Sequence, residues 1–104
     1  MIAPAILTLR ARRALGAALR RIASDSPDAA DRFYEAVQQA VHGLGGNPAR
    51  GAHRPGLADL RYRFGSIPRS RDLMVYAGAS DPLRIVRIVH ASRDLPQVLG
   101  DLLR

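Results

Sequence analysis

The side chains with the clearest chemical potential in this sequence are basic. Arg61 and Arg63 alternate along one segment, and Arg87, His90 and Arg93 follow near the C-terminus. Guanidinium groups bind phosphates and an imidazole transfers protons near neutral pH. Such a set suits cleavage of RNA through attack of a 2′-hydroxyl on the adjacent phosphate. The same side chains would serve equally well as a protein-binding surface, so both interpretations stay open on these residues alone.

Several other kinds of chemistry are excluded by composition and spacing. Cysteine is absent, which removes disulfides, thiolate zinc sites, iron–sulfur clusters and thiol nucleophiles. His42, His53 and His90 lie far apart in the sequence beside a single glutamate, so no metal site is expected. The glycines do not form a phosphate-binding loop, because no strand precedes them and no lysine follows. We therefore expect neither a metal nor a cofactor.

The charge of the chain requires an anionic partner. Sixteen basic residues against nine acidic ones give a formal net charge of +7, and every basic residue is arginine. Such a charge favours binding to nucleic acid, to an acidic protein segment, or to a machine that handles nucleic acid.

The length of 104 residues predicts a single domain over residues 1–104. Apolar residues make up 47% of the chain, the usual proportion for a folded globular protein. No apolar run approaches the roughly 18 to 20 residues that span a bilayer. The first arginines follow the N-terminal apolar stretch, the reverse of a secretory signal. We expect a cytoplasmic protein that does not bind membranes.

The first half of the chain predicts a strand and two helices. Residues 2–9 are apolar and indicate a short edge strand, and from about Arg10 an apolar stripe at helical spacing begins. Ser26, Pro27 and Asp28 form a helix start, with the serine as the N-cap. The second helix ends at 45–48, where two glycines, an asparagine and a proline stop it. So short a connection between the helices predicts an antiparallel hairpin.

The second half predicts three strands and a short helix. Alternation over 60–64 indicates a strand with Leu60, Tyr62 and Phe64 on its buried face, and apolar runs at 72–77 and 83–91 indicate inner strands. Short turns between them predict an antiparallel meander. Asp94 is the expected N-cap of a final short helix. The fold class is therefore α+β: a helical hairpin packed on a small antiparallel β-sheet around one core, with a short C-terminal helix.

The last strand carries the residues of greatest interest. Strict alternation places four side chains on one face and three on the other: Arg84, Val86, Ile88 and His90 against Ile85, Arg87 and Val89. On this pattern Arg87 and His90 do not converge. Arg87 is expected either to be exposed or to be buried against Asp72, Asp94 or a terminal carboxylate. For His90 we favour a structural role that holds the strand end to the turn after it.

These segments together resemble a known family, the ParE branch of the RelE/ParE toxin superfamily. The resemblance covers roughly residues 7–99 and is carried by SPDAADRFYEAV, LGGNPARGAHRPGL, LRYRF, DLMVYA and above all RIVRIVHASRDLPQVL. It implies the same helical hairpin on an antiparallel sheet. It also implies a toxin of a bacterial type II toxin–antitoxin module, of the kind used in plasmid stabilisation.

Two targets are known in the superfamily: RelE-type toxins cleave mRNA on the ribosome, whereas ParE-type toxins poison DNA gyrase. This chain has no lysine and no tyrosine after Tyr76, and alanine rather than tyrosine follows His90. The resemblance therefore favours a gyrase poison that acts by binding, with growth inhibition as its effect and no catalytic residues assigned. The alternative is a ribosome-dependent endoribonuclease. Target binding is assigned to Arg61, Arg87, His90 and Arg93.

The resemblance also implies a cognate ParD-like antitoxin that forms a hetero-oligomer with the toxin. Its acidic residues would match Arg12, Arg13, Arg20 and Arg61. The charge is better suited to this antitoxin and to a DNA-handling enzyme than to phosphates or bases, so direct nucleic-acid binding is not expected. A third hypothesis is a degenerate toxin that binds its antitoxin and harms no target.

Overall fold

The computed structural model describes residues 5–103. Its elements follow in the order β1 (Ala5–Leu7), α1 (Leu9–Asp25), α2 (Pro27–Gly46), η1 (Pro48–Arg50), β2 (Tyr62–Ser66), β3 (Asp72–Ala77), β4 (Leu83–His90), α3 (Leu95–Val98) and η2 (Gly100–Leu103), where η denotes a 3-10 helix. The strand expected at 2–9 is observed as β1, and residues 2–4 of that expectation lie outside the described part of the chain.

Side-chain caps define the helical hairpin. The Thr8 hydroxyl accepts a hydrogen bond from the Ala11 N–H at 3.2 Å and begins α1. The Ser26 hydroxyl accepts from the Ala29 N–H at 3.1 Å and begins α2, with Pro27 in the first position. Each cap satisfies an N–H group that the first helical turn leaves without a partner. The predicted helix start at Ser26 is confirmed, as is the predicted end of α2.

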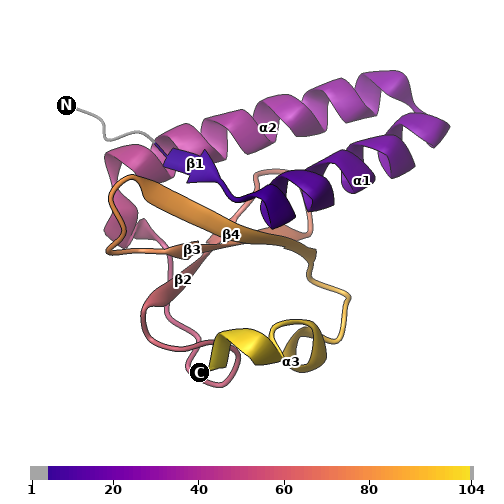
Figure 1. Ribbon diagram of the computed structural model, residues 1–104. Coiled ribbons are helices and arrows are strands. Elements are labelled where there is room, and N and C mark those ends of the chain that lie inside the picture. The colour runs from indigo at the N-terminus through magenta and orange to yellow at the C-terminus, as the bar shows by residue number, and fades with distance from the viewer. Residues whose placement is uncertain (1–4, 104) are drawn as a thin grey trace.

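The sheet has the order β1-β4-β3-β2, and the helical hairpin covers one of its faces (Figure 1). Strands β2, β3 and β4 form the predicted antiparallel meander, and the α+β fold class is confirmed. The sheet as a whole is mixed, because β1 pairs with β4 in parallel. A parallel pair requires a crossover connection, which the two helices help to provide, whereas the short turns of the meander impose antiparallel pairing.

A bulge in β4 makes the expectation of strict alternation wrong. Val75 pairs with Arg87 while the next residue, Tyr76, pairs with Ile85, so β4 holds one extra residue at this point. After a bulge the two faces of a strand exchange their residue parity. Ile85 and Ile88 consequently pack on the helical side of the sheet, and Val86 and Val89 pack on the opposite side.

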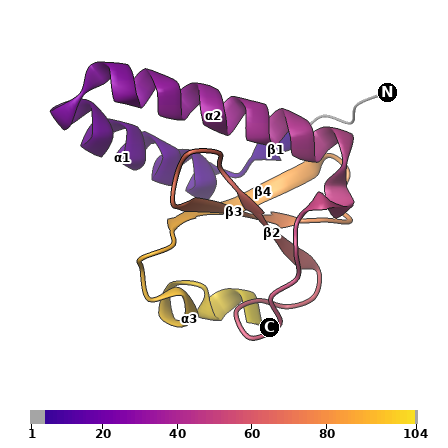
Figure 2. The same cartoon turned by 180° about the vertical axis from the view of Figure 1, so that it is seen from behind.

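The sheet has a core on each face rather than the single core expected from sequence. Beneath the hairpin, Met74, Tyr76 and Ile85 are buried together with the helical residues Val37 and Leu44. On the other face Phe64 and Val75 pack against Leu99 and Leu102. Figure 2 shows the C-terminal segment with α3 on the side of the sheet away from the helical hairpin. Strands β3 and β4 are apolar at nearly every position, so both of their faces need cover, and the C-terminal segment supplies the second layer.

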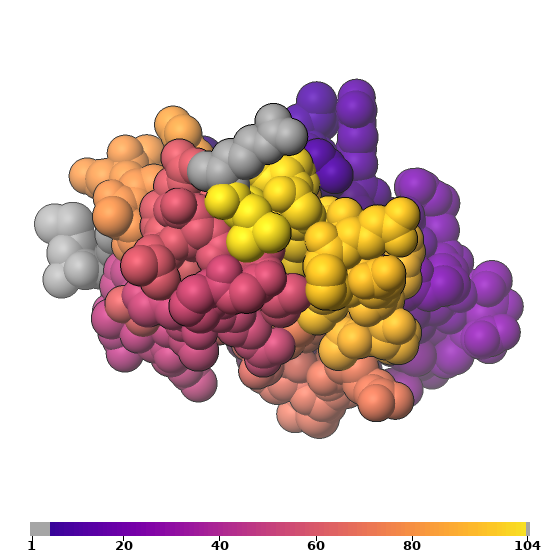
Figure 3. Space-filling model, turned by 90° about the horizontal axis from the view of Figure 1, so that it is seen from below, coloured from indigo at the N-terminus to yellow at the C-terminus, as the bar shows by residue number. Residues whose placement is uncertain are grey.

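The second layer also includes the segment that leads into β2. The Asp59 N–H donates to the Leu102 carbonyl at 2.7 Å, and seen from below these two stretches lie side by side (Figure 3). Strand β2 begins at Tyr62, and Leu60 is 63% exposed, so its expected burial is wrong. The reason is a turn: the Asp59 carboxylate accepts from the Arg61 N–H at 3.0 Å and holds Leu60 outside the sheet.

No helix within residues 5–103 is long and apolar enough to cross a lipid bilayer.

Candidate functional site

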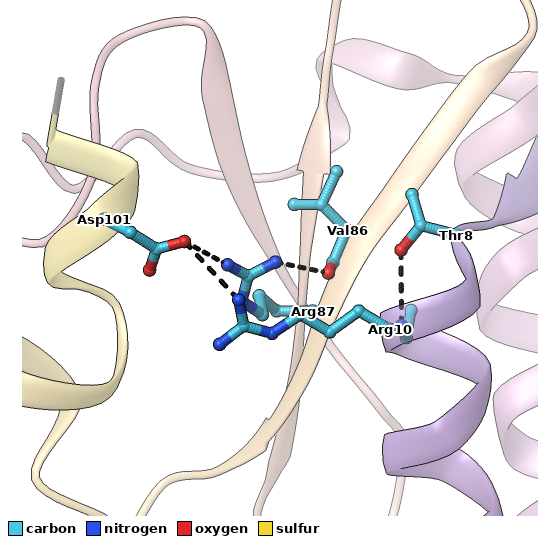
Figure 4. A network of polar contacts seen from close by, with 6 residues as sticks. Thr8, Arg10, Val86, Arg87 and Asp101 are labelled. Atoms are coloured by element: carbon cyan, nitrogen blue, oxygen red, sulfur yellow. Dashed lines mark hydrogen bonds and ion pairs between the residues drawn. The ribbon is translucent and has the colours of Figure 1, made fainter.

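Arg87 is held at the junction of three elements. Its guanidinium group is paired with Asp101 of η2 and donates to the Val86 carbonyl at 2.9 Å (Figure 4). Arg10 of α1 reaches the same carboxylate at 3.6 Å. The Arg87 side chain is only 12% exposed. Burial lowers the pKa of Arg87, and the nearby Arg10 lowers it further, while Asp101 acts in the opposite direction. Arg87 therefore fastens the C-terminal segment to β4.

Sequence reasoning left the partner of Arg87 open, and the structure identifies it as Asp101 rather than Asp72 or Asp94. Asp94 instead caps α3, as expected, by accepting from the Gln97 N–H at 3.4 Å. Asp72 is buried, and its carboxylate accepts from the Ser70 hydroxyl at 2.6 Å.

His90 has the structural role expected from the sequence. Its Nδ1 lies 2.6 Å from the Ser92 hydroxyl and accepts the Ser92 N–H at 3.1 Å. A neutral imidazole that accepts a backbone N–H at Nδ1 carries its proton at Nε2. His90 thus ties the end of β4 to the turn that follows it.

Three of the four predicted target-binding residues are brought together by the fold. Arg87, His90 and Arg93 line a hollow of about 270 Å³ between α1 and the C-terminal end of β4. The register of β4 is regular from Arg87 to His90, so the bulge does not change how these two residues face each other, and they line the hollow from opposite faces of the strand. Sequence reasoning missed two helical arginines that line the same hollow, Arg10 and Arg21.

Arg61, the fourth predicted residue, is not part of this hollow. It precedes β2, at the opposite edge of the sheet from β1. Its Nε lies 3.5 Å from the Asp59 carboxylate, and its guanidinium group stacks over the Tyr62 ring at 5.2 Å from the ring centroid. The four residues therefore do not form one constellation.

A second hollow, of about 500 Å³, adjoins the first and shares Arg21, Asp72 and His90 with it. Arg32 of α2 and Arg69 of the β2–β3 turn complete its basic lining. The backbone of Arg69 has a φ of 58°, a left-handed conformation that residues other than glycine and asparagine adopt at a cost in free energy. One sequence feature indicated a turn at Arg69: Pro68 precedes it, and prolines often open turns in which the next residue has a positive φ.

The loop before β2 is anchored by Tyr76. Its hydroxyl accepts from the Gly51 N–H at 2.8 Å and donates to the Pro48 carbonyl at 2.8 Å. Arg63 donates to the Gly51 carbonyl at 2.7 Å. Burial raises the pKa of Tyr76, while the hydrogen bond from Gly51 and the charge of Arg63 act to lower it. The segment from Asn47 to Gly51 is therefore held in place by hydrogen bonds to Tyr76 and Arg63.

A groove on the opposite side of the helical hairpin is apolar. It has a volume of about 780 Å³ and lies between β1, α1 and α2, where Leu15, Val41 and the 43% exposed Ile6 and Tyr34 line it. Arg12 lies at this groove.

Two of the other three arginines assigned to antitoxin binding, Arg13 and Arg20, are exposed on α1, and neither lines the groove. Arg20 lines a separate shallow hollow between the helices together with Tyr34. Arg13 is exposed on the helix surface. The three helical arginines thus share one helix but face different surroundings, and Arg61 is remote from them.

The fold and these surfaces define a small cationic α+β protein that presents arginine-lined hollows on one side of a helical hairpin and an apolar groove on the other. Within residues 5–103 no cluster of three or more histidine, aspartate or glutamate side chains could hold a metal ion. Residues 5–95 match the family described as "ParE toxin of type II toxin-antitoxin system, parDE". The chain belongs to this family of type II toxins.

Among solved structures the fold is similar to a chain of the "Chromosomal ParDE TA system from P. aeruginosa". That chain aligns with a TM-score of 0.72 and 18% sequence identity, over 88% of this chain and 98% of its own length. At this identity the likeness concerns the fold. The curated proteins contain no match to this chain.

Proposed function

We propose that this ParE-family toxin poisons DNA gyrase by binding it and that a cognate antitoxin neutralises it. The observation that carries this proposal is that the residues an endoribonuclease would use are engaged within the fold or lie apart from the others. Arg61 lies outside the hollow that Arg87, His90 and Arg93 line, and the Arg87 guanidinium group is paired with Asp101. Cleavage needs a general base and a phosphate-binding cation that are both available to one substrate group, whereas Arg87 and His90 are each held by a partner within the fold.

The engagement of His90 supports the same conclusion. Its Nδ1 accepts the Ser92 N–H, so only Nε2 is left to meet a substrate, and in the neutral ring Nε2 carries a proton. That imidazole could not act as a base through either nitrogen without first breaking its contact with Ser92. Binding through exposed arginines requires no such rearrangement.

The experiment that tests the target is a supercoiling assay with purified gyrase and relaxed plasmid. The toxin should inhibit supercoiling and accumulate cleaved DNA, and a parallel translation reaction should show no codon-positioned cuts in mRNA. Unaffected gyrase at excess toxin would contradict the proposal. Cuts in translated mRNA that disappear on His90→Ala would instead support the endoribonuclease.

The apolar groove suits the antitoxin. A partner segment that laid apolar side chains over Ile6 and Tyr34 would bury surface that is now exposed, and β1 beside them is an edge strand of the sheet. Arg12 at the groove would attract acidic residues that flank such a segment. Of the four residues assigned to antitoxin binding, Arg12 is therefore the one best supported.

A further inference from the structure

The two basic hollows hold an excess of positive charge that the fold leaves without a counterpart. Arg21, Arg32, Arg69 and Arg93 take part in no ion pair within residues 5–103. The one acidic residue that lines these hollows is Asp72, which is 7% exposed and is hydrogen-bonded to Ser70. Like charges gathered without acidic partners repel one another, so their convergence destabilises the free protein unless an anion binds there.

The arginines come from separate parts of the chain, which makes their convergence a property of the fold. α1 supplies Arg21, α2 supplies Arg32, the β2–β3 turn supplies Arg69 and the segment after β4 supplies Arg93. The hollows are lined by residues of α1 and of the end of β4. Figure 1 shows this end of β4 beneath α1.

The β2–β3 turn provides a second observation that indicates a binding site. Arg69 has a φ of 58°, at a position where glycine would be free of the cost. The strained backbone of Arg69 thus carries a charged side chain that lines the hollow. Strain of this kind is found at binding sites, where the surrounding structure maintains it.

The chemistry of the lining distinguishes between anionic partners. The second hollow includes Phe33, which is 8% exposed, and both hollows include the His90 imidazole, which is hydrogen-bonded to Ser92, so neither has an exposed phenylalanine, tyrosine or tryptophan on which bases could stack. Protein partners are usually anchored by aromatic or apolar side chains that fill a pocket, and none of the exposed large apolar side chains within residues 5–103 lines these two hollows. Arginine-rich surfaces without such anchors are typical of contacts with a phosphate backbone.

We propose that the surface formed by Arg21, Arg32, Arg69, His90 and Arg93 binds the phosphate backbone of duplex DNA without reading its sequence. The sequence led us to expect no direct binding to nucleic acid, because it gives the number of arginines but not which of them lie together in the fold. The proposal does not depend on gyrase as the target, because the toxin alone would bind DNA. If gyrase is the target, the surface would contact the DNA that the enzyme holds.

The test is fluorescence anisotropy with a labelled 20-base-pair duplex of mixed sequence and the full-length toxin. We compare Arg21→Gln with Arg20→Gln, because the two residues are neighbours on α1, lose the same charge and line different hollows. Arg21→Gln should weaken binding roughly fivefold and reduce the slope of log K against log salt by about 0.9, the change for one lost phosphate contact. Arg20→Gln should change the affinity less than about twofold.

Arg69→Gly provides a second variant that removes a contact while relieving the backbone, so it should remain folded and still bind DNA more weakly. Equal weakening by Arg20→Gln and Arg21→Gln would overturn the proposal, since binding would then reflect net charge alone. The absence of DNA binding by the unaltered toxin at about 50 mM salt would also overturn it. An oligoglutamate peptide that displaces the duplex as well as unlabelled DNA of equal charge would assign the surface to an acidic protein instead.

Discussion

The guanidinium group of Arg87, in the interior of β4, pairs with the carboxylate of Asp101 in the final turn of the described chain. Arg10 of α1 approaches the same carboxylate at 3.6 Å, so one acidic residue joins both layers of the protein to the sheet (Figure 4). The Nε of Arg87 is buried without a hydrogen-bond partner within residues 5–103. The pairing with Asp101 is thus the main compensation for burying this cation.

We expect Asp101→Asn to lower the free energy of unfolding by about 1 to 2 kcal/mol, because it leaves Arg87 buried without its charged partner. Arg10→Gln is the matched control, since it removes an exposed member of the same network and should cost less than about 1 kcal/mol. Urea unfolding measures both. Equal effects of the two substitutions would show that the Arg87 pair is no stronger than a surface contact.

Gly51→Ala should destabilise the protein through a collision. A Cβ at this position would meet the Tyr76 hydroxyl and lie 2.7 Å from the Phe64 carbonyl oxygen. We expect a loss of about 1 to 3 kcal/mol in the free energy of unfolding. Gly56→Ala in the same loop is the control, because within residues 5–103 no atom beyond its chain neighbours lies within 4 Å of the added methyl group, and its effect should stay within about 0.5 kcal/mol. Thermal unfolding that ranks the two variants equally would contradict this account.

The raised pKa of Tyr76 predicts a loss of stability in alkali. Tyrosine in the unfolded chain ionises near its ordinary value of 10.0, whereas burial keeps the folded side chain protonated to higher pH. Above pH 10 the unfolded state therefore binds fewer protons, and the free energy of unfolding falls as pH rises. Below pH 10 this contribution is fully present.

Tyr76→Phe should remove this part of the alkaline decline. It should also cost about 1 to 3 kcal/mol at neutral pH, because the hydroxyl's bonds to Gly51 and Pro48 are lost. Urea unfolding from about pH 8 to pH 11 measures both effects. An alkaline slope identical in the two proteins would show that Tyr76 does not titrate differently on folding.

Arg12→Glu should slow association with a cognate ParD-like antitoxin, because it reverses a charge at the apolar groove. We expect the association rate to fall roughly tenfold at low salt, with a smaller difference at high salt. Arg71→Glu makes the same charge change at an exposed site outside the groove and is the control. Stopped-flow mixing measures both rates, and equal slowing would indicate a general charge effect rather than binding at the groove.

The sequence by itself determined the elements and their class. Ser26 and Pro27 marked the start of α2, two glycines marked its end, and the apolar runs marked β3 and β4, because capping and periodicity are local properties of the chain. The two-helix hairpin and the meander followed from short connections. The role of His90 at the end of β4 was also accessible, since its partner Ser92 lies two residues away.

Only the tertiary structure decided which side chains meet. The bulge at Val75 and Tyr76 exchanged the faces of β4, and periodicity cannot show where a strand gains a residue. The pairing of Arg87 with Asp101 depends on the C-terminal segment folding back over the sheet. The grouping of Arg21, Arg32 and Arg69 depends on how two helices and a turn are packed. Charges far apart in the sequence converge through packing geometry, and no local pattern records that geometry.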